Sequence, residues 1–123
     1  MGAGKLGKML EDGEIIFRQG DVGDSMYVIQ EGQVEVFVER QGTEVRLRLL
    51  GEGETVGEMA IFARETRSAS VRALGRVRVL TLDKKTFLTR VQQDPSLAFR
   101  ILETMSRRIR ELSDEVVRLR SEN

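Results

Sequence analysis

Residues Gly57–Val71 read GEMAIFARETRSASV, and this stretch has the composition of an anion-binding loop. Gly57 lets the backbone approach a ligand closely because it has no side chain. A one-turn helix starting there would direct free N–H groups, and the positive end of its dipole, toward a phosphate. Arg67 offers a planar set of donors that matches phosphate oxygens two at a time, and Ser68 and Ser70 can add hydroxyls.

Glu58 differs from the rest of the stretch because a carboxylate repels phosphate. It accepts hydrogen bonds well from a sugar hydroxyl. A phosphate-binding end beside a hydroxyl-binding end suits a nucleotide with one phosphate and a free ribose hydroxyl. The alternative is a surface turn that carries a Glu–Arg ion pair.

The sequences GEMAIF at 57–62 and RSASV at 67–71 resemble the phosphate-binding cassette of the cyclic nucleotide-binding domain family. The resemblance implies that Glu58 binds the ribose 2′-hydroxyl, Arg67 pairs with the cyclic phosphate and Ser68 is a second phosphate donor. Two departures from the family pattern remove no ligand-contacting group: Thr66 replaces a common proline, and Thr55-Val56 replace aromatics. The full set of ligand-binding residues that it implies is Gly57, Glu58, Met59, Ala60, Arg67, Ser68 and Ala69, with Val36 and Leu47 on the pocket wall.

Composition excludes several other classes of protein. The chain has 123 residues, enough for one domain with its own core, and 20 basic residues balance 20 acidic ones. It has no cysteine and no histidine, so disulfides, thiol chemistry and the usual metal ligands are absent. No apolar run approaches the about 20 residues that span a bilayer, and no signal-peptide pattern is seen at the start of the sequence. We therefore expect a cytoplasmic protein without a membrane or nucleic-acid partner and without a cofactor or metal.

Two further families fit only part of the sequence. The amino-terminal stretch 2–8 matches the G-x-x-x-x-G-K of a nucleotide P-loop, but Met9 stands where Ser or Thr must bind magnesium, and no strand precedes it. Cupins share a jelly-roll architecture, but their metal chemistry depends on histidines that this chain lacks. We reject both assignments.

The region from Glu14 to Leu82 predicts short β-strands separated by glycine. Val34, Val36 and Val38 alternate with less apolar positions, as in a half-buried strand, and Gln41-Gly42 suits a hairpin tip. The fold predicted is mainly β with helices: a double-sheet β jelly roll with short flanking helices and a long C-terminal helix. The strands predicted are Ile15–Phe17, Met26–Ile29, Val34–Val38, Val45–Leu50, Ser70–Leu74 and Val77–Leu82, with turns at Gly20, Gly23, Gly32, Gly42, Gly51 and Gly53.

After Asp83 the pattern becomes helical. Lys84–Gln93 predicts a short amphipathic helix, and Pro95 suits the first turn of the next one. In that last helix, apolar residues are spaced by 3, 4, 3, 4 and 3 positions, which is a heptad seam. Leu102, Ile109 and Val116 occupy a positions, and Met105, Leu112 and Leu119 occupy d positions, a pattern that favours a parallel dimer.

The alternative is that this helix packs its apolar stripe on its own sheet. Leu97, Phe99 and Ile101 could supply that contact instead and leave the seam free. In the dimer, Glu115 at g would face Arg120 at e of the other helix. The sequence therefore predicts three segments in the chain: a lead-in at 1–13, the jelly roll at 14–83 with the cassette at 57–71, and helices at 84–122.

The last helix also bears on the ligand. It resembles the long helix that covers the nucleotide in the family and that forms the dimer in bacterial members. This resemblance places Arg108 and Ser113 near the base, and Leu112 where a hydroxyl residue would make one more base contact. The heptad agrees, because Arg108 at g faces Ser113 at e across the seam. The alternative for Arg108 is a solvated surface charge.

The sequence contains no recognisable nucleophile–base pair, so we expect no enzymatic activity. The predicted function is a regulatory sensor that binds a cyclic mononucleotide, cAMP by preference or cGMP, and couples binding to the position of the C-terminal helix. Because Asn123 follows that helix closely, we expect no helix-turn-helix after it in this chain. The alternative function is a structural or protein-docking jelly roll that binds no nucleotide. A downstream protein is a further partner that we expect for such a sensor.

Overall fold

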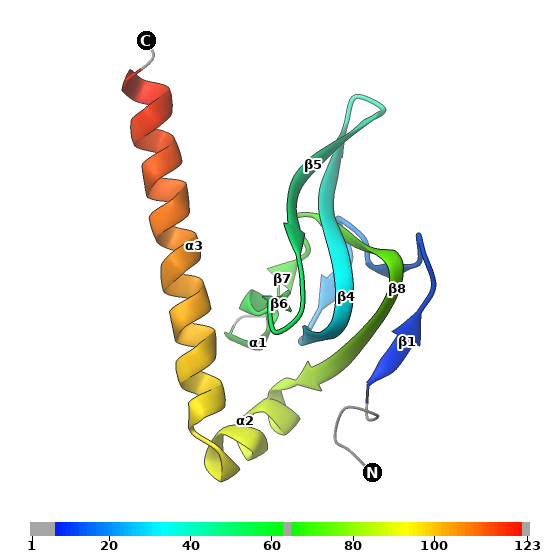
Figure 1. Cartoon of the computed structure of the whole chain (residues 1–123), viewed down its shortest axis with the longest axis vertical. Coiled ribbons are helices and arrows are strands. Elements are labelled where there is room, and N and C mark those ends of the chain that lie inside the picture. Colours follow the sequence, from blue (N-terminus) through cyan, green and yellow to red (C-terminus); the bar gives the residue numbers. More distant parts are fainter. Residues whose placement is uncertain (1–6, 63–64, 122–123) are drawn as a thin grey trace. The chain divides into compact units, whose positions relative to one another are not determined.

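The computed structural model describes residues 7–62 and 65–121. They belong to two compact units, one ending at Phe87 and the other beginning at Leu88. Figure 1 labels the elements, which are β1 (Lys8–Leu10), β2 (Ile15–Phe17), β3 (Val22–Gly23), β4 (Ser25–Arg40), β5 (Thr43–Leu50), β6 (Thr55–Val56), α1 (Met59–Phe62), β7 (Glu65–Thr66), β8 (Ser70–Asp83), α2 (Lys84–Gln93) and α3 (Ser96–Ser121).

The first unit is organised around the two long strands β4 and β8. They pair antiparallel from Ser25–Asp83 at one end to Phe37–Ser70 at the other, and the register shifts near Glu31–Gln33. On one side of this shift β6 pairs with β4 and β1 with β8, and on the other side β5 pairs with β4 and β2 with β8. The two long strands therefore run through both layers of a double-sheet jelly roll, as the sequence predicted.

The two layers meet at the register shift near Gly32, which we call the joint. This joint depends on glycine. Gly32 in β4 has φ 88°, and a Cβ there would lie 2.5 Å from the carbonyl oxygen of Arg76 in β8. The sequence predicted a turn at Gly32 that separates two strands, and this is wrong. Gly32 forms an irregularity inside one continuous strand, because hydrogen bonds to β8 resume on both sides of it. The predicted strands Ser70–Leu74 and Val77–Leu82 are likewise one strand, β8.

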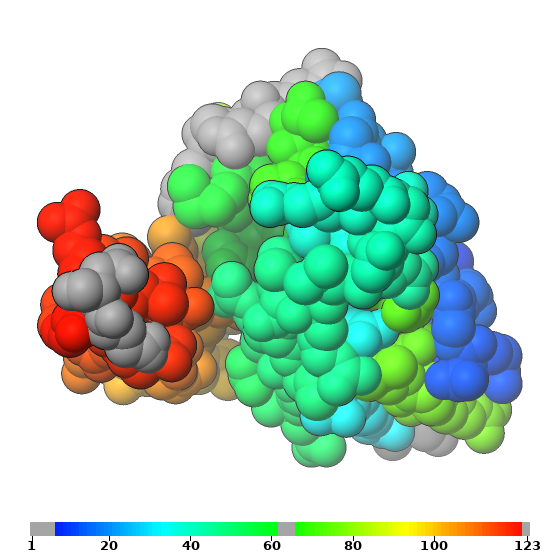
Figure 2. Space-filling view, turned by 90° about the horizontal axis from the view of Figure 1, so that it is seen from above, coloured from blue at the N-terminus to red at the C-terminus, as the bar shows by residue number. Residues whose placement is uncertain are grey.

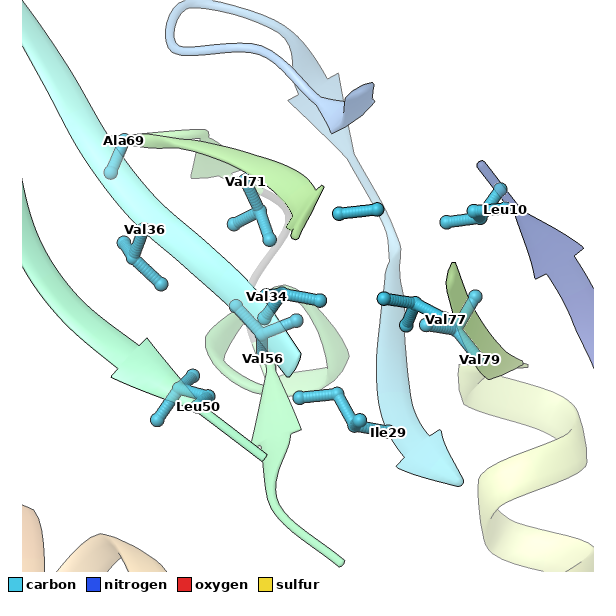
Figure 3. Close-up of a cluster of buried hydrophobic side chains, with 11 residues drawn as sticks. Leu10, Ile29, Val34, Val36, Leu50, Val56, Ala69, Val71, Val77 and Val79 are labelled. Atoms are coloured by element: carbon cyan, nitrogen blue, oxygen red, sulfur yellow. The ribbon is translucent and has the colours of Figure 1, made fainter. Parts of the chain in front are cut away.

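The hydrophobic core lies between the layers (Figure 3). Val34 and Val36 face inward, as their alternation predicted. The core residues come from β1, β4, β5, β6 and β8 and the segment before β8: Leu10, Ile29, Val34, Val36, Leu50, Val56, Ala69, Val71, Ala73, Val77 and Val79. The tip of the β4–β5 hairpin lies on the surface seen in Figure 2. Gln41 and Gly42 form this tip with φ 54° and 80°, the two positive values of a tight hairpin turn.

Glu35 and Phe37, at the positions of β4 that alternate with the inward valines, are also buried, which the alternation did not predict. Glu35 accepts from Arg46 Nε at 2.5 Å and from Arg72 Nε at 2.7 Å. The Arg72 guanidinium stacks 4.1 Å from the centroid of the Phe37 ring. The hydrogen bonds from Arg46 and Arg72 outweigh desolvation and lower the pKa of Glu35. This cluster of side chains ties β5 and β8 to β4 across the outer face.

The amino-terminal segment is more than the lead-in that the sequence predicted for 1–13. Lys8–Leu10 form β1 along β8, and Leu10 is a core residue. A three-residue strand carries too little local signal to be recognised, because its partner lies almost 70 positions away. Most of the stretch 2–8 that matches a P-loop lies outside the described residues, and Lys8 belongs to β1.

The two predicted helices are confirmed. Asp83 accepts a 2.7 Å hydrogen bond from the Thr86 backbone N–H at the start of α2. Asp94 accepts from the Ser96 N–H and hydroxyl at the start of α3, and Pro95 lies immediately before the helix, where its carbonyl accepts from Phe99 N at 3.3 Å. Within α3 the apolar seam is exposed at Leu102, Ile109, Leu112, Val116 and Leu119, and Met105 is half-buried. Among the described residues, no helix has the length and apolar character that crossing a membrane requires.

Candidate phosphate-binding site

The backbone of the candidate site turns sharply at Gly57, which follows β6 and precedes α1. Gly57 has φ 78°, and a Cβ there would lie 2.7 Å from Nη1 of Arg67. The first turn of α1 closes with hydrogen bonds from Ala60 N to Gly57 O and from Ile61 N to Glu58 O, both 3.1 Å long. Position 57 therefore needs glycine both for its backbone conformation and for the space beside Arg67.

Arg67 is held at both its backbone and its side chain. Its N–H donates to Asp21 O at 2.7 Å, and its carbonyl accepts from Gly20 N at 2.9 Å. Only 8% of the residue is exposed. Nη2 donates to Ser25 O at 2.8 Å, Nη1 donates to Gly57 O at 3.4 Å, and the guanidinium stacks 4.1 Å from the Phe17 ring centroid.

The Arg67 guanidinium is not saturated by these partners. Its Nε is buried and has no hydrogen-bond partner among the described residues. A buried cation with an unused donor is costly unless an acceptor binds to it, so this group is suited to an anionic ligand. The backbone carbonyls of Ser25 and Gly57 have no net charge, so they do not neutralise the Arg67 cation.

Glu58 is buried beside the same turn. It is 6% exposed, and the Thr55 hydroxyl lies 3.4 Å from its Oε2 as a donor. Thr55 is buried as well. One carboxylate and one guanidinium are therefore positioned by the same short segment, from β6 to the start of β8. No group of three or more potential metal ligands occurs in the part of the chain that the structure describes.

The structure brings part of the predicted set together. Gly57 and Arg67 are in contact, and Glu58 follows directly at the start of α1. Ala60 and Ala69 are buried, whereas Met59 and Ser68 are exposed. Ser70 stays a predicted further phosphate donor. It is buried, and its hydroxyl accepts a 2.8 Å hydrogen bond from Gln19 N, which fixes the loop after β2.

The predicted pocket wall and lid are more dispersed. Val36 is buried in the core, and Leu47 is half exposed on β5. Arg108, Leu112 and Ser113 all lie on α3, in the second unit. Their roles at the site stay predictions.

Three residues that touch Arg67 were not predicted. Phe17 was assigned only to a strand, Gly23 only to a turn, and Ser25 contributes a backbone carbonyl. Gly23 lies in β3, which pairs with β7, rather than in a turn. A single sequence carries no signal for these contacts, because they join segments more than 40 positions apart.

Comparison with known proteins identifies the family and the fold of this chain. The family model "Cyclic nucleotide-binding domain" matches residues 8–94. The Cyclic AMP receptor protein of Thermus thermophilus is 34% identical over 110 residues, which are 89% of this chain and 51% of that protein. The cAMP-dependent protein kinase regulatory subunit of Blastocladiella emersonii is 39% identical over 77 residues, 62% of this chain and 19% of that protein.

Solved structures that resemble this chain agree with the family match. The Catabolite Activator Protein of Thermus thermophilus has a TM-score of 0.79 and 32% identity, covering 95% of this chain and 56% of that one. The EAL enzyme Bd1971 in its cAMP-bound form has a TM-score of 0.64 and 35% identity, covering 89% of this chain and 30% of that one. Its cGMP-bound form gives the same TM-score and identity, with 94% and 32% covered.

The chain thus spans between about a fifth and a half of the two relatives' lengths. The family match includes the whole jelly roll and the cassette at 57–71. The chain belongs to the cyclic nucleotide-binding domain family.

Proposed function

We propose that this domain binds cAMP in preference to cGMP, with Arg67 and Ser68 on the cyclic phosphate and Glu58 on the ribose 2′-hydroxyl. The observation that carries the proposal is the buried guanidinium of Arg67, whose Nε has no hydrogen-bond partner among the described residues. A singly charged phosphate would neutralise this cation and accept its remaining donors. Ser68 is exposed next to Arg67 and is available to the same phosphate.

The preference for cAMP is supported by the names of the relatives. Both the Thermus thermophilus receptor and the Blastocladiella emersonii regulatory subunit are named for cAMP. The Bd1971 neighbour is described in both a cAMP-bound and a cGMP-bound form, so the fold admits either base. Ser68 is the feature of this chain that favours cGMP, because cGMP binders of the family tend to have a hydroxyl residue after the arginine.

The regulatory output assigned to this domain is the C-terminal helix. The apolar seam of α3 is exposed at five of its six a and d positions, so a second copy of the helix could bury it. We assign to this seam a parallel homodimer, and to Arg108, Leu112 and Ser113 a contact with the base. Ligand binding would then bias α3 through contacts that only the occupied site provides. The domain leaves its ligand intact and acts on a downstream protein.

Calorimetric titration with cAMP, cGMP and ATP tests the proposal. We expect saturable one-site binding of both cyclic nucleotides, tighter for cAMP, and no binding of ATP with magnesium. Arg67→Ala should abolish most of the affinity, whereas Arg76→Ala, at a surface arginine of β8, should leave it unchanged. Binding of ATP without a response to either cyclic nucleotide would refute the proposal.

A further inference from the structure

Arg67 lies in a socket of four residues, and only one of them, Gly57, belongs to the cassette at 57–71. We define the Arg67 socket as Phe17, Gly23, Ser25 and Gly57. The Phe17 ring stacks on the guanidinium, the carbonyls of Ser25 and Gly57 accept from its two Nη atoms, and Gly23 lies beside it. Three of the four residues come from β2, β3 and β4, which precede the cassette in the chain.

Gly23 is required in the socket for space. A Cβ at this position would lie 2.5 Å from Cζ of Arg67, and its other nearest neighbours are also guanidinium atoms. The backbone of Gly23 has no positive φ, so an L-residue would fit the local conformation. Any side chain at 23 would therefore displace the guanidinium rather than strain the strand.

Phe17 contacts two members of the site at once. Its ring centroid is 4.1 Å from Cζ of Arg67, and a Cβ on Gly57 would lie 3.2 Å from its Cε2. The ring is itself packed at 5.8 Å from Tyr27 and against the core. A ring fixed in this way restricts the plane in which the guanidinium can lie.

We propose that Phe17 and Gly23 are positioning residues for the cyclic phosphate: they fix the guanidinium plane of Arg67 before the ligand arrives. The inference rests on the proposed function, in which Arg67 binds that phosphate. A guanidinium has five N–H groups, and the two carbonyls occupy one on each Nη. The Phe17 ring holds the guanidinium plane of Arg67, and the absence of a side chain at Gly23 leaves room for it. The remaining N–H groups of Arg67 therefore keep one orientation. The ordering cost is then met during folding instead of during binding.

A structural role for Phe17 predicts a different result. If the ring served the core alone, its loss would lower stability and leave the guanidinium geometry, and hence phosphate affinity, intact in the folded fraction. The chain provides a matched control, because the Phe37 ring stacks on Arg72 at the same distance of 4.1 Å on the other face of β4. Gly51 is the control for Gly23, since it has no positive φ and its Cβ would touch only the Gly32 carbonyl, at 3.9 Å.

The test measures cAMP affinity by calorimetry, with thermal unfolding to show that each variant is folded. Phe17→Leu should weaken binding by about 2- to 30-fold, the range of a partly buried cation–π contact. Gly23→Ala should weaken it by about 10- to 100-fold, as expected when a charged group is displaced from its partner by about 1 Å. Phe37→Leu and Gly51→Ala should change affinity by less than about twofold, because distant sites act independently.

A double-mutant cycle separates positioning from packing. Lysine lacks the planar fork, so in an Arg67→Lys background both substitutions should add less than about a twofold loss. Equal losses in the two backgrounds would overturn the inference, since Phe17 and Gly23 would then act independently of the guanidinium. If Gly23→Ala fails to fold, Phe17→Leu decides the question alone.

The Nε–H resonance of Arg67, assigned by its loss in Arg67→Lys, gives a readout that packing alone would not move. We expect a distinct position in the wild type without ligand, and a shift toward the average of the exposed arginines in Phe17→Leu. An unchanged resonance in Phe17→Leu would overturn the inference. A wild type that binds no cyclic nucleotide would instead refute the proposed function, so the two failures are distinguishable.

Discussion

Arg67 and Glu58 are equally buried, but they are expected to contribute differently to binding. Arg67→Ala should weaken cAMP binding by about 3–5 kcal/mol, because the phosphate would lose its charged partner in a desolvated site. Glu58→Gln should cost about 1.5–3 kcal/mol, the value of one hydrogen bond with a charged member. Calorimetric titration of both variants against cAMP measures the difference. Equal losses, or a larger loss at Glu58, would mean that backbone amides hold most of the phosphate.

A second prediction concerns Glu35 and pH. The arginines lower its folded-state pKa below the ordinary value of 4.5, so the unfolded chain takes up this proton first as the pH falls. The stabilisation from Glu35 is therefore complete above about pH 4.5 and is lost as the pH falls through the lower, folded-state pKa. Urea unfolding at pH 7 and at several lower values measures it.

Glu35→Gln should cost about 1–3 kcal/mol at pH 7, less than a fully buried pair because Arg46 is half exposed, and should flatten the acid dependence of stability. Glu39→Gln is the matched control, since Glu39 is an exposed carboxylate of the same strand. If both variants keep the acid dependence of the wild type, the Glu35 cluster does not stabilise the fold through its charge.

At the scale of residues, the sequence predicted the chemical groups of the site but not what holds them. Glu58 and Arg67 could be predicted because the cassette is continuous in the chain and each group has a chemistry suited to a nucleotide. Phe17 and Ser25 could not, because they reach Arg67 through strand pairing and, in the case of Ser25, only through a backbone atom. The sequence did not predict the contact of Ser70 with Gln19 N, because a hydroxyl suits a loop anchor as well as a phosphate.

At the scale of elements, the joint between the two layers gives a sharp prediction. Gly32 and Gly75 both have positive φ, 88° and 70°, but only Gly32 lies close to other atoms. Gly75→Ala should cost about 1–2 kcal/mol of stability for its backbone conformation alone. Gly32→Ala should cost about 1–3 kcal/mol more, because its methyl group would collide with the Arg76 carbonyl.

Urea unfolding of the two glycine variants measures this difference directly, and Gly51→Ala controls for the loss of a glycine. Equal costs at 32 and 75 would show that the strands separate easily at the joint. The double-sheet architecture would then depend on the core rather than on the close approach of β4 and β8.

The same joint explains why the strands were predicted more reliably than their connections. Each predicted strand lies within a strand of the structure, since alternating valines and β-branched residues carry a local signal. A glycine in a turn and a glycine in an irregularity look alike in sequence, so β4 and β8 were each divided in two. The helices were easier, because their caps and their 3.6-residue period are local as well.

At the scale of the whole molecule, the question is whether α3 joins two copies of the chain. Ile109 and Val117 lie on the same helix and are exposed to the same extent, 64% and 63%. Only Ile109 belongs to the heptad seam, at an a position, whereas Val117 lies beside it. The two residues therefore form a matched pair, in which the same substitution adds the same charge to the same helix.

Ile109→Glu should convert a dimer into a monomer, because two carboxylates would face each other where apolar side chains should pack. Val117→Glu should leave the dimer intact. Sedimentation of the wild type and both variants, each with and without cAMP, measures the outcome. A wild type that sediments as a monomer throughout would contradict the seam. If α3 also contacts the base, Ile109→Glu should weaken cAMP binding by about 1–2 kcal/mol, which is about 5- to 30-fold, while Arg67 keeps the phosphate. A dimer in which Arg108→Ala and Ser113→Ala bind cAMP at full strength would retain the seam but separate it from the ligand.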